Sequence, residues 1–134
     1  MSFKPENYRS PQQMWNQEVD RSKEIFAGFM QRTGIVIDLE QQLHWMKRRR
    51  HRVLHVIGEM YPMVGRSWLS LMHREGHRPG LNRSELRAIC VKLRIPRWND
   101  MTTDEMRATL VILTWLQKID PEASFWDSPN SEAL

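Results

Sequence analysis

The densest group of chemically active side chains in this sequence is the basic run Lys47-Arg48-Arg49-Arg50-His51-Arg52. Guanidinium and ammonium groups bind phosphate oxygens through charge-assisted hydrogen bonds, so such a run favours a polyanionic partner. If the run lies inside one helix, it contributes to a basic face about three turns long, whose members are His44, Arg48, His51, Arg52 and His55. We therefore expect this face to lie along the phosphate backbone of a nucleic acid.

Two other interpretations of the basic run stay open. Its arginines would pair with the acidic ends of this chain or of a second subunit if the run were only a solvated helix face. As a helix on a membrane surface, the run would instead meet anionic lipid. Arg50 is the exception within the run, because on a helical wheel it falls in the apolar stripe between Met46 and Val53. A charge there must snorkel, pair with a carboxylate, or mark where the stripe leaves the core.

A second basic group follows further along the chain, where Arg83, Arg87 and Arg94 share one ridge of a predicted helix. Arg97 and Trp98 come next, in a predicted loop, and an indole beside arginines is suited to stacking on a base. The other interpretation of Trp98 is that it closes the end of the bundle. The two groups together make up the predicted nucleic-acid contacts, which are Lys47, Arg48, Arg49, Arg52, Arg83, Arg87, Arg94, Arg97 and Trp98.

Trp45 precedes Arg49 by about one helical turn, on a side of the helix away from the main apolar stripe. An aromatic side chain in that position needs a neighbour. The neighbour is another helix of the bundle, a partner molecule, or the guanidinium of Arg49 stacked on the indole.

Catalysis and metal binding find little support in the sequence. There is no glycine-rich phosphate loop and no nucleophile motif. The pairs His51/His55 and His73/His77 have the spacing of zinc ligands, but no further ligand accompanies either pair. We expect no enzyme activity, no catalytic residue, no metal and no cofactor.

Charge is unevenly distributed along the 134 residues, although the net charge is only +4. Residues 41–97 contain thirteen Lys and Arg against three Asp and Glu, whereas both flanking parts carry net negative charge. A basic centre of this kind indicates an anionic partner. The lone Cys90 is consistent with a reducing compartment, and no apolar run is long enough for a membrane span or a signal segment. We expect a cytoplasmic protein.

Helical periodicity and end signals predict an all-α chain. Ser10-Pro11 begins a helix over residues 11–33, and the pairs Asp38/Gln41, Asn82/Glu85 and Thr102/Glu105 have the spacing of capping boxes. The remaining predicted helices cover residues 38–60 or 38–61, 62–75, 82–94 and 102–119. The last of these is apolar nearly all round in its second half, which is typical of a helix at the centre of a fold or in a subunit interface.

These elements predict a compact bundle of four to five helices with flexible termini. The expected organisation is a flexible lead over residues 1–9, a single helical domain over residues 10–120 and a loose acidic tail over residues 121–134. The long helix over residues 38–60 and the apolar helix over residues 102–119 offer more apolar surface than a bundle of this size readily buries. We therefore expect a homodimer.

Residues 84–119 combine a basic helix, an apolar step, a loop with Trp98, and a capped apolar helix that ends near Trp115. In this order of residue types the stretch resembles the small C-terminal domain of phage antirepressor and DNA-binding regulatory proteins. The resemblance covers about a quarter of the chain and implies a phage or prophage origin and a regulatory or DNA-transaction role. The resemblance identifies no residue of this chain that would read a base.

The function predicted from these features is a nucleic-acid-binding accessory or regulatory protein that contacts mainly backbone phosphates, with DNA favoured over RNA. The alternative is a protein-interaction module, such as an inhibitor or adaptor of a host nucleic-acid enzyme. Its basic residues would then meet an acidic protein surface, and no nucleic acid would bind. Neither function involves a membrane.

Overall fold

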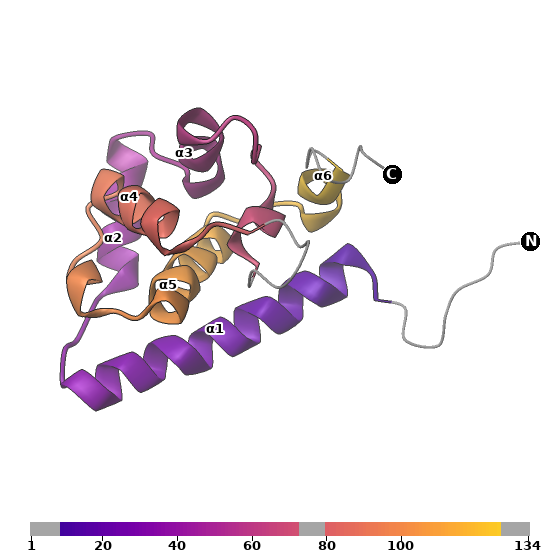
Figure 1. The fold of residues 1–134 in the computed structure, drawn as a ribbon. Coiled ribbons are helices and arrows are strands. Elements are labelled where there is room, and N and C mark those ends of the chain that lie inside the picture. Colours follow the sequence, from indigo (N-terminus) through magenta and orange to yellow (C-terminus); the bar gives the residue numbers. More distant parts are fainter. Residues whose placement is uncertain (1–8, 73–79, 127–134) are drawn as a thin grey trace, which may run out of the picture.

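The computed structural model describes residues 9–72 and 80–126, and every regular element within these residues is helical. The predicted all-α bundle is therefore confirmed (Figure 1). In chain order the elements are α1 (Pro11–Thr33), α2 (Leu39–Arg48), α3 (Val53–Met60), the 3₁₀ turn η1 (Trp68–Leu71), α4 (Arg83–Lys92), the 3₁₀ turn η2 (Trp98–Asp100), α5 (Thr103–Leu116) and α6 (Pro121–Trp126).

Side-chain caps define the starts of the helices as predicted. The side chains of Ser10, Asn82 and Thr102 each accept a hydrogen bond from the backbone N–H three residues later, and the N–H of each cap residue donates to the side-chain oxygen of that later residue. These reciprocal bonds satisfy backbone donors that a helix leaves unpaired at its start. Asp38 caps α2 by accepting from the Gln41 N–H at 3.1 Å, but its own N–H does not donate to the Gln41 side chain, so the predicted capping box is wrong at this helix.

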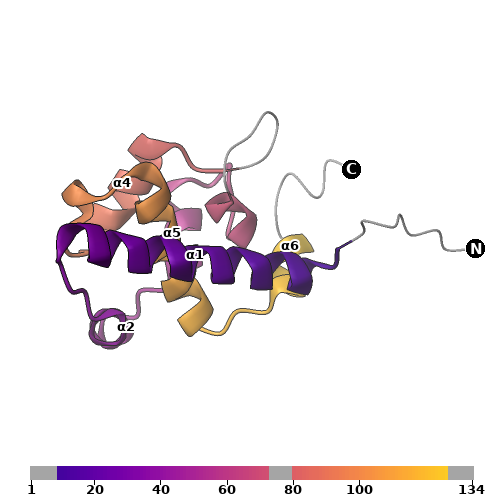
Figure 2. The same cartoon turned by 90° about the horizontal axis from the view of Figure 1, so that it is seen from below.

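Helix α5 occupies the centre of the molecule, in contact with α1, α2, α3, α4 and η1 (Figure 1). All of residues 105–114 are buried, which confirms the prediction that this helix is central. Figure 2 shows α1 lying along α5 on one side, where the apolar face of α1 packs. Other helices of the same chain cover α5, so its apolar surface does not require a second subunit. The homodimer therefore stays a prediction that α5 does not support.

Trp68 is the largest side chain that is completely buried. Its ring centroid lies 5.3 Å from that of Trp15 on α1, and its indole N–H donates to the carbonyl oxygen of Pro121 at 3.1 Å. The η1 turn is thereby joined to both α1 and α6. Cys90 is also buried, and burial raises the pKa of its thiol to about 12.

The predicted helix over residues 38–60 is wrong as a continuous element, because it is broken between α2 and α3. Arg50 has a φ of +56°, the His51 N–H donates to the Met46 carbonyl at 2.8 Å, and the Arg50 N–H donates to the Lys47 carbonyl at 3.1 Å. This pattern is a Schellman motif, which ends a helix. A continuous helix would carry Arg50 into the apolar stripe, where an unpaired guanidinium is costly, and the break leaves it exposed.

Arg50→Gly is expected to raise the free energy of unfolding by about 0.5–1 kcal/mol, because glycine adopts a positive φ without the Cβ clash. Arg48→Gly is the matched control, since Arg48 has helical geometry in the last turn of α2. That control should lower stability by about 0.5–1 kcal/mol. Urea denaturation of both variants measures the difference, and equal destabilisation would contradict the expected role of the Arg50 conformation.

The predicted helix over residues 62–75 is also wrong within the described part. Residues 62–64 form a turn, Gly65 has a φ of +82°, and only the η1 turn follows. Ser67 begins η1 by accepting a hydrogen bond from the Leu69 N–H at 3.1 Å. A residue with positive φ interrupts helical geometry, so the two segments do not join. Residues 73–79, with the end of the predicted helix, most of the predicted turn and the pair His73/His77, lie outside the described residues.

Near the C-terminus, the structure corrects two further boundaries. Helix α5 ends at Leu116 and not near residue 119, because Lys118 has a φ of +56° and its N–H donates to the Trp115 carbonyl. The prediction of a loose tail is wrong for the first six residues of that segment, because they form α6, which packs against α1 and η1. Residues 127–134 of that tail and residues 1–8 of the predicted lead lie outside the described residues.

Candidate nucleic-acid interface

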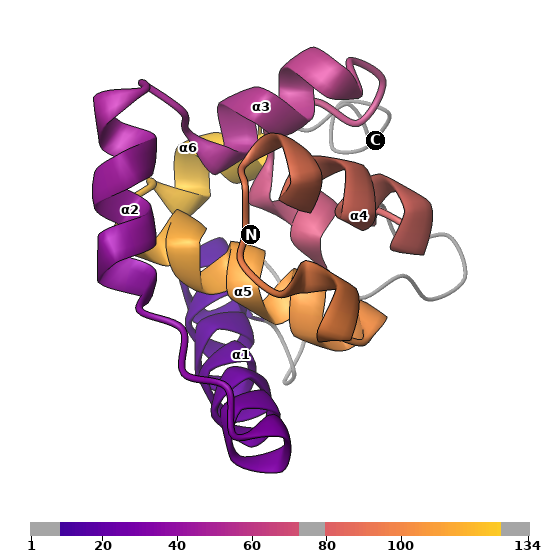
Figure 3. The ribbon, with the colours of Figure 1, turned by 90° about the vertical axis from the view of Figure 1, so that its left-hand side faces the viewer.

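The basic run occupies the junction between α2 and α3. Lys47, Arg48, Arg49, Arg50 and Arg52 are all exposed there. The break at Arg50 means that they surround a turn, so the single basic face predicted along one helix is wrong. Figure 3 shows this junction on the side of the molecule where α3 and α4 also lie.

Trp45 brings the two predicted basic groups together. The guanidinium carbon of Arg49 lies 4.6 Å from the centroid of the Trp45 ring, and that of Arg94, at the end of α4, lies 5.5 Å from it. The ring of His51 meets the same indole edge-on at 5.8 Å. Of the neighbours left open for Trp45, the structure shows two, the Arg49 guanidinium and the core of the bundle. Trp45 also packs partly against the core, so it holds two cations from distant parts of the chain at the surface.

Arg94 reaches Trp45 because α4 ends before it. Arg94 has a φ of +53°, and the Ile95 N–H donates to the Cys90 carbonyl at 2.9 Å, which again forms a Schellman-type end. A hydrogen bond between α2 and the end of α4 keeps the two helices together here, with the side-chain amide of Gln42 donating to the Leu93 carbonyl at 2.7 Å. The prediction that Arg94 continues a ridge with Arg83 and Arg87 is therefore wrong, because Arg94 lies outside α4.

Arg87 and Trp98 form a second guanidinium–indole contact, with 5.1 Å between the Arg87 guanidinium carbon and the Trp98 centroid. Trp98 is half-buried and packs partly against the core, in line with the interpretation that it closes one end of the bundle. Arg97 beside it is exposed, but its Nε donates to the Asp100 carboxylate at 2.6 Å. Stacking of Trp98 on a base stays a prediction.

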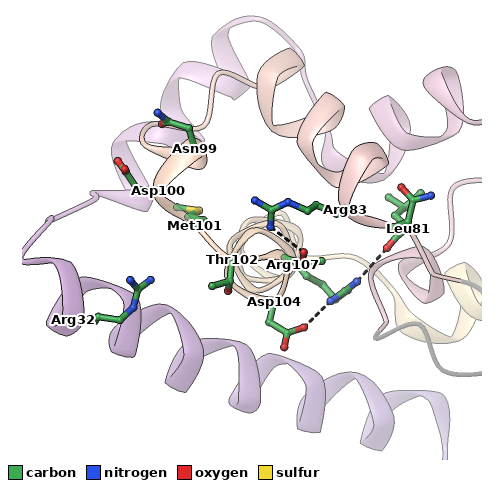
Figure 4. A pocket seen from close by; sticks show the side chains of 11 residues that line it. Arg32, Leu81, Arg83, Asn99, Asp100, Met101, Thr102, Asp104 and Arg107 are labelled. Atoms are coloured by element: carbon green, nitrogen blue, oxygen red, sulfur yellow. Dashed lines mark hydrogen bonds and ion pairs between the residues drawn. The ribbon is translucent and has the colours of Figure 1, made fainter.

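Arg83 lies in a different place from the other predicted contacts. Its guanidinium donates to the Thr103 hydroxyl at 3.1 Å and lines a pocket of about 650 Å³ over the start of α5 (Figure 4). Arg32 and Arg107 line the same pocket. The structure thus separates Arg83 from the cations around Trp45.

Two charged residues of α5, Glu105 and Arg107, are buried, and neither is among the predicted nucleic-acid contacts. Arg107 donates to the Asp104 carboxylate at 2.8 Å and to the Leu81 carbonyl at 3.1 Å (Figure 4), and burial lowers the pKa of its guanidinium. Glu105 accepts two hydrogen bonds from Arg32 on α1, at 2.7 and 2.9 Å. The only sequence signals were the spacing of Asp104 and Arg107 and the capping position of Glu105.

The Arg32–Glu105 contact makes stability depend on pH. Burial by itself would raise the pKa of Glu105, but hydrogen bonds from Arg32 and Thr102 and the charge of Arg32 hold that pKa below its ordinary value. A carboxylate whose pKa is lowered by folding stabilises the native state above its unfolded pKa and loses that contribution as pH falls through the folded pKa.

We expect Glu105→Gln to lower the free energy of unfolding by about 1–2 kcal/mol at pH 7, because half-exposed Arg32 limits the gain from the contact. Below the ordinary carboxylate range, near pH 3, the difference from wild type should shrink. Urea denaturation at both pH values tests this. A difference that stays constant with pH would show that the charge of Glu105 contributes nothing.

Gln117, at the end of α5, holds the α2–α3 junction in place. Its amide nitrogen donates to the His51 carbonyl at 3.1 Å, and its amide oxygen accepts from the Val53 N–H at 3.0 Å. Both backbone groups belong to the break that exposes the basic run. Gln117 was not predicted, since its role depends on a contact between residues distant in the chain.

The charges on this side of the molecule are not cancelled within the described part of the chain. Every described Lys and Arg between positions 41 and 97 is exposed. Among them only Arg97 is ion-paired with a described carboxylate. The interpretation in which these arginines pair with the acidic ends of the same chain is therefore not supported within the described residues.

The His-x₃-His pair is split by the break, with His51 against Trp45 and His55 paired to Glu59 at 2.8 Å. No group of three or more His, Cys, Asp or Glu in the described ranges is placed to hold a metal ion. No helix in the same ranges has both the length and the apolar character that crossing a membrane requires. Comparisons with protein-family models, curated proteins and solved structures give no match.

Proposed function

We propose that this protein binds nucleic acid through the backbone phosphates, at a surface formed by Lys47, Arg48, Arg49 and Arg52 of the α2–α3 junction and by Arg94, which approaches Arg49 at Trp45, hereafter the basic surface. The observation that carries the proposal is that these five cations are exposed and have no described carboxylate partner. Desolvating such a cluster against another cation or an apolar surface is unfavourable, whereas a polyanion stabilises it and releases counterions on binding.

The composition of the basic surface supports binding with weak sequence preference. Arginine forms bidentate contacts with phosphate, and the contacts of Arg49 and Arg94 with Trp45 restrict both side chains before binding. Phosphate contacts alone do not read bases. The resemblance of residues 84–119 to phage regulatory proteins favours DNA and an accessory or regulatory role in a phage-encoded system.

The test is the affinity for a fluorescent DNA duplex as a function of salt concentration. If about six phosphates are neutralised, the logarithm of the association constant falls with the logarithm of salt concentration at a slope of about −5. A slope near zero would rule out binding through phosphates. Repeating the titration with an RNA duplex distinguishes the two nucleic acids.

A protein-interaction module is the second candidate, and exposed apolar side chains favour it. Val36 and Met63 are 86% and 88% exposed. Tryptophan and arginine, both present at the basic surface, are enriched in protein interfaces. Capture of the same host protein from a lysate with and without nuclease, together with no DNA binding at low salt, would favour this function over the first.

A further inference from the structure

A groove of about 580 Å³ lies beside Trp45, between the segment that follows α1, helix α2 and the residues after α4. Its volume falls within the range of about 300–1,000 Å³ that is usual for small-molecule sites. The lining residues that matter here are Val36, Gln41, Trp45, Arg48, Arg94 and Pro96. Two of the five cations of the basic surface therefore also line a concave site.

Apolar and charged surfaces meet in this groove. Val36, Pro96 and the half-buried Trp45 supply apolar and aromatic area, and Arg48 and Arg94 supply positive charge. One carboxylate, that of Asp38, also lines the groove, where it accepts a hydrogen bond from the Gln41 N–H at 3.1 Å, so the two arginines leave the lining with a net charge of +1. The side-chain amide of Gln41, which is exposed, adds a donor and an acceptor. A nucleotide has the matching parts, since its base is flat and carries polar edges and its phosphate is anionic.

Such a groove distinguishes unpaired from paired nucleic acid. In a duplex the bases are stacked inside, so a protein surface of this shape meets only phosphates and groove edges. A single strand offers each base for stacking on an aromatic side chain, next to the phosphates that basic residues bind. A smaller pocket of about 210 Å³, lined by Trp45, Arg48 and Arg49, borders the same indole and offers space to an adjacent nucleotide.

We propose that this groove binds an unpaired nucleotide of a single-stranded nucleic acid, with the base against Trp45 and Pro96. The base takes the place of the Arg94 guanidinium, which lies 5.5 Å from the Trp45 centroid in the free protein, and the flanking phosphates lie at Arg48 and Arg94. The proposal rests on the proposed function and makes it more specific. Single-stranded nucleic acid becomes the preferred ligand, and duplex binding becomes the weaker mode that uses phosphates alone.

The test compares fluorescein-labelled oligothymidylate of about 12 nucleotides with a duplex of equal length, by fluorescence anisotropy. We expect the single strand to bind wild-type protein about 10-fold more tightly. Trp45→Leu should weaken single-strand binding about 10-fold and duplex binding by only about 3-fold. Both ligands lose the ordering of Arg49 and Arg94 by the indole, whereas the loss of base stacking affects the single strand alone. Trp115→Leu is the matched control, since Trp115 is 39% exposed on α5 and does not line the groove.

A second pair of variants covers the case in which Trp45→Leu fails to fold. Val36→Asp places a carboxylate at a highly exposed position in the groove, and Met63→Asp places the same charge at an exposed position outside it. Val36→Asp should reduce the preference for single strand over duplex, and Met63→Asp should not.

The outcomes separate the two proposals. Equal affinity of wild type for single strand and duplex, or equal losses for both ligands in Trp45→Leu or in Val36→Asp, would overturn the groove proposal and leave the proposed function standing. If neither ligand binds at low salt, the proposed function itself is wrong.

Discussion

Simultaneous replacement of Lys47, Arg48, Arg49 and Arg94 by glutamine is expected to weaken duplex DNA binding by about 100- to 1,000-fold at low salt. Each phosphate contact contributes roughly 1 kcal/mol to the binding free energy, and about 1.4 kcal/mol corresponds to a tenfold change in affinity. The slope of log affinity against log salt should become less negative by about 0.9 for each phosphate that is no longer neutralised. All four side chains are exposed, so glutamine leaves the core unchanged.

A matched set of substitutions controls for overall charge. Arg9, Arg21, Lys23 and Arg83 are exposed and lie outside the basic surface, and their replacement by glutamine removes the same charge. We expect this control to lower affinity by less than about 10-fold, through the long-range field alone. If both quartets weaken binding equally, the protein binds DNA by its net charge and not at the basic surface.

Trp68→Ala is expected to lower the free energy of unfolding by about 3–5 kcal/mol. Trp68 has no exposed surface, so its removal leaves a cavity bordered by Trp15. The Pro121 carbonyl also loses the indole N–H bond of 3.1 Å that joins η1 to α6. Since small domains have a total stability of only about 5–15 kcal/mol, the variant should unfold at much lower urea concentration.

Trp115→Ala provides the comparison for this effect. Trp115 is 39% exposed and contacts Lys23, whose ammonium lies 3.9 Å from the ring centroid. Removal of an exposed cation–π interaction and of partial burial should lower stability by only about 0.5–1.5 kcal/mol. Circular dichroism during urea titration measures both variants. Equal midpoints for Trp68→Ala and Trp115→Ala would show that the Trp68 contacts do not stabilise the native state.

Most predictions that rest on local bonds agree with the structure. Asn82 and Thr102 form the capping boxes that their spacing indicated, because a capping box needs only residues three positions apart, and Ser10 caps α1 ahead of Pro11 as predicted. The pair Asp38/Gln41 has the same spacing but forms only one of the two bonds. The apolar character of residues 111–116 predicted a central helix, and α5 is central. The stacking of Arg49 on Trp45 was also within reach of the sequence, since one helical turn separates the two residues.

The candidate site was predicted in composition but not in arrangement. Of the predicted contacts, Lys47, Arg48, Arg49, Arg52 and Arg94 lie on the basic surface, whereas Arg83 lines another pocket. Arg94 joins Arg49 only because α4 ends at Lys92 and α2 lies beside that end, which the Gln42–Leu93 hydrogen bond holds. No periodicity within α4 indicates such a contact.

The helical class, the capped helix starts and the concentration of cations in the middle of the chain follow from composition and from neighbours a few residues apart, so they could be predicted before folding was considered. The position of the break within residues 38–60 follows from contacts between residues that are distant in the chain. Gln117 binds the backbone at His51 and Val53, and the break keeps Arg50 out of the core. The helical wheel marks Arg50 as a charge within the apolar stripe, but which of the possible outcomes occurs depends on the groups that surround the folded chain, because an unpaired buried charge is costly.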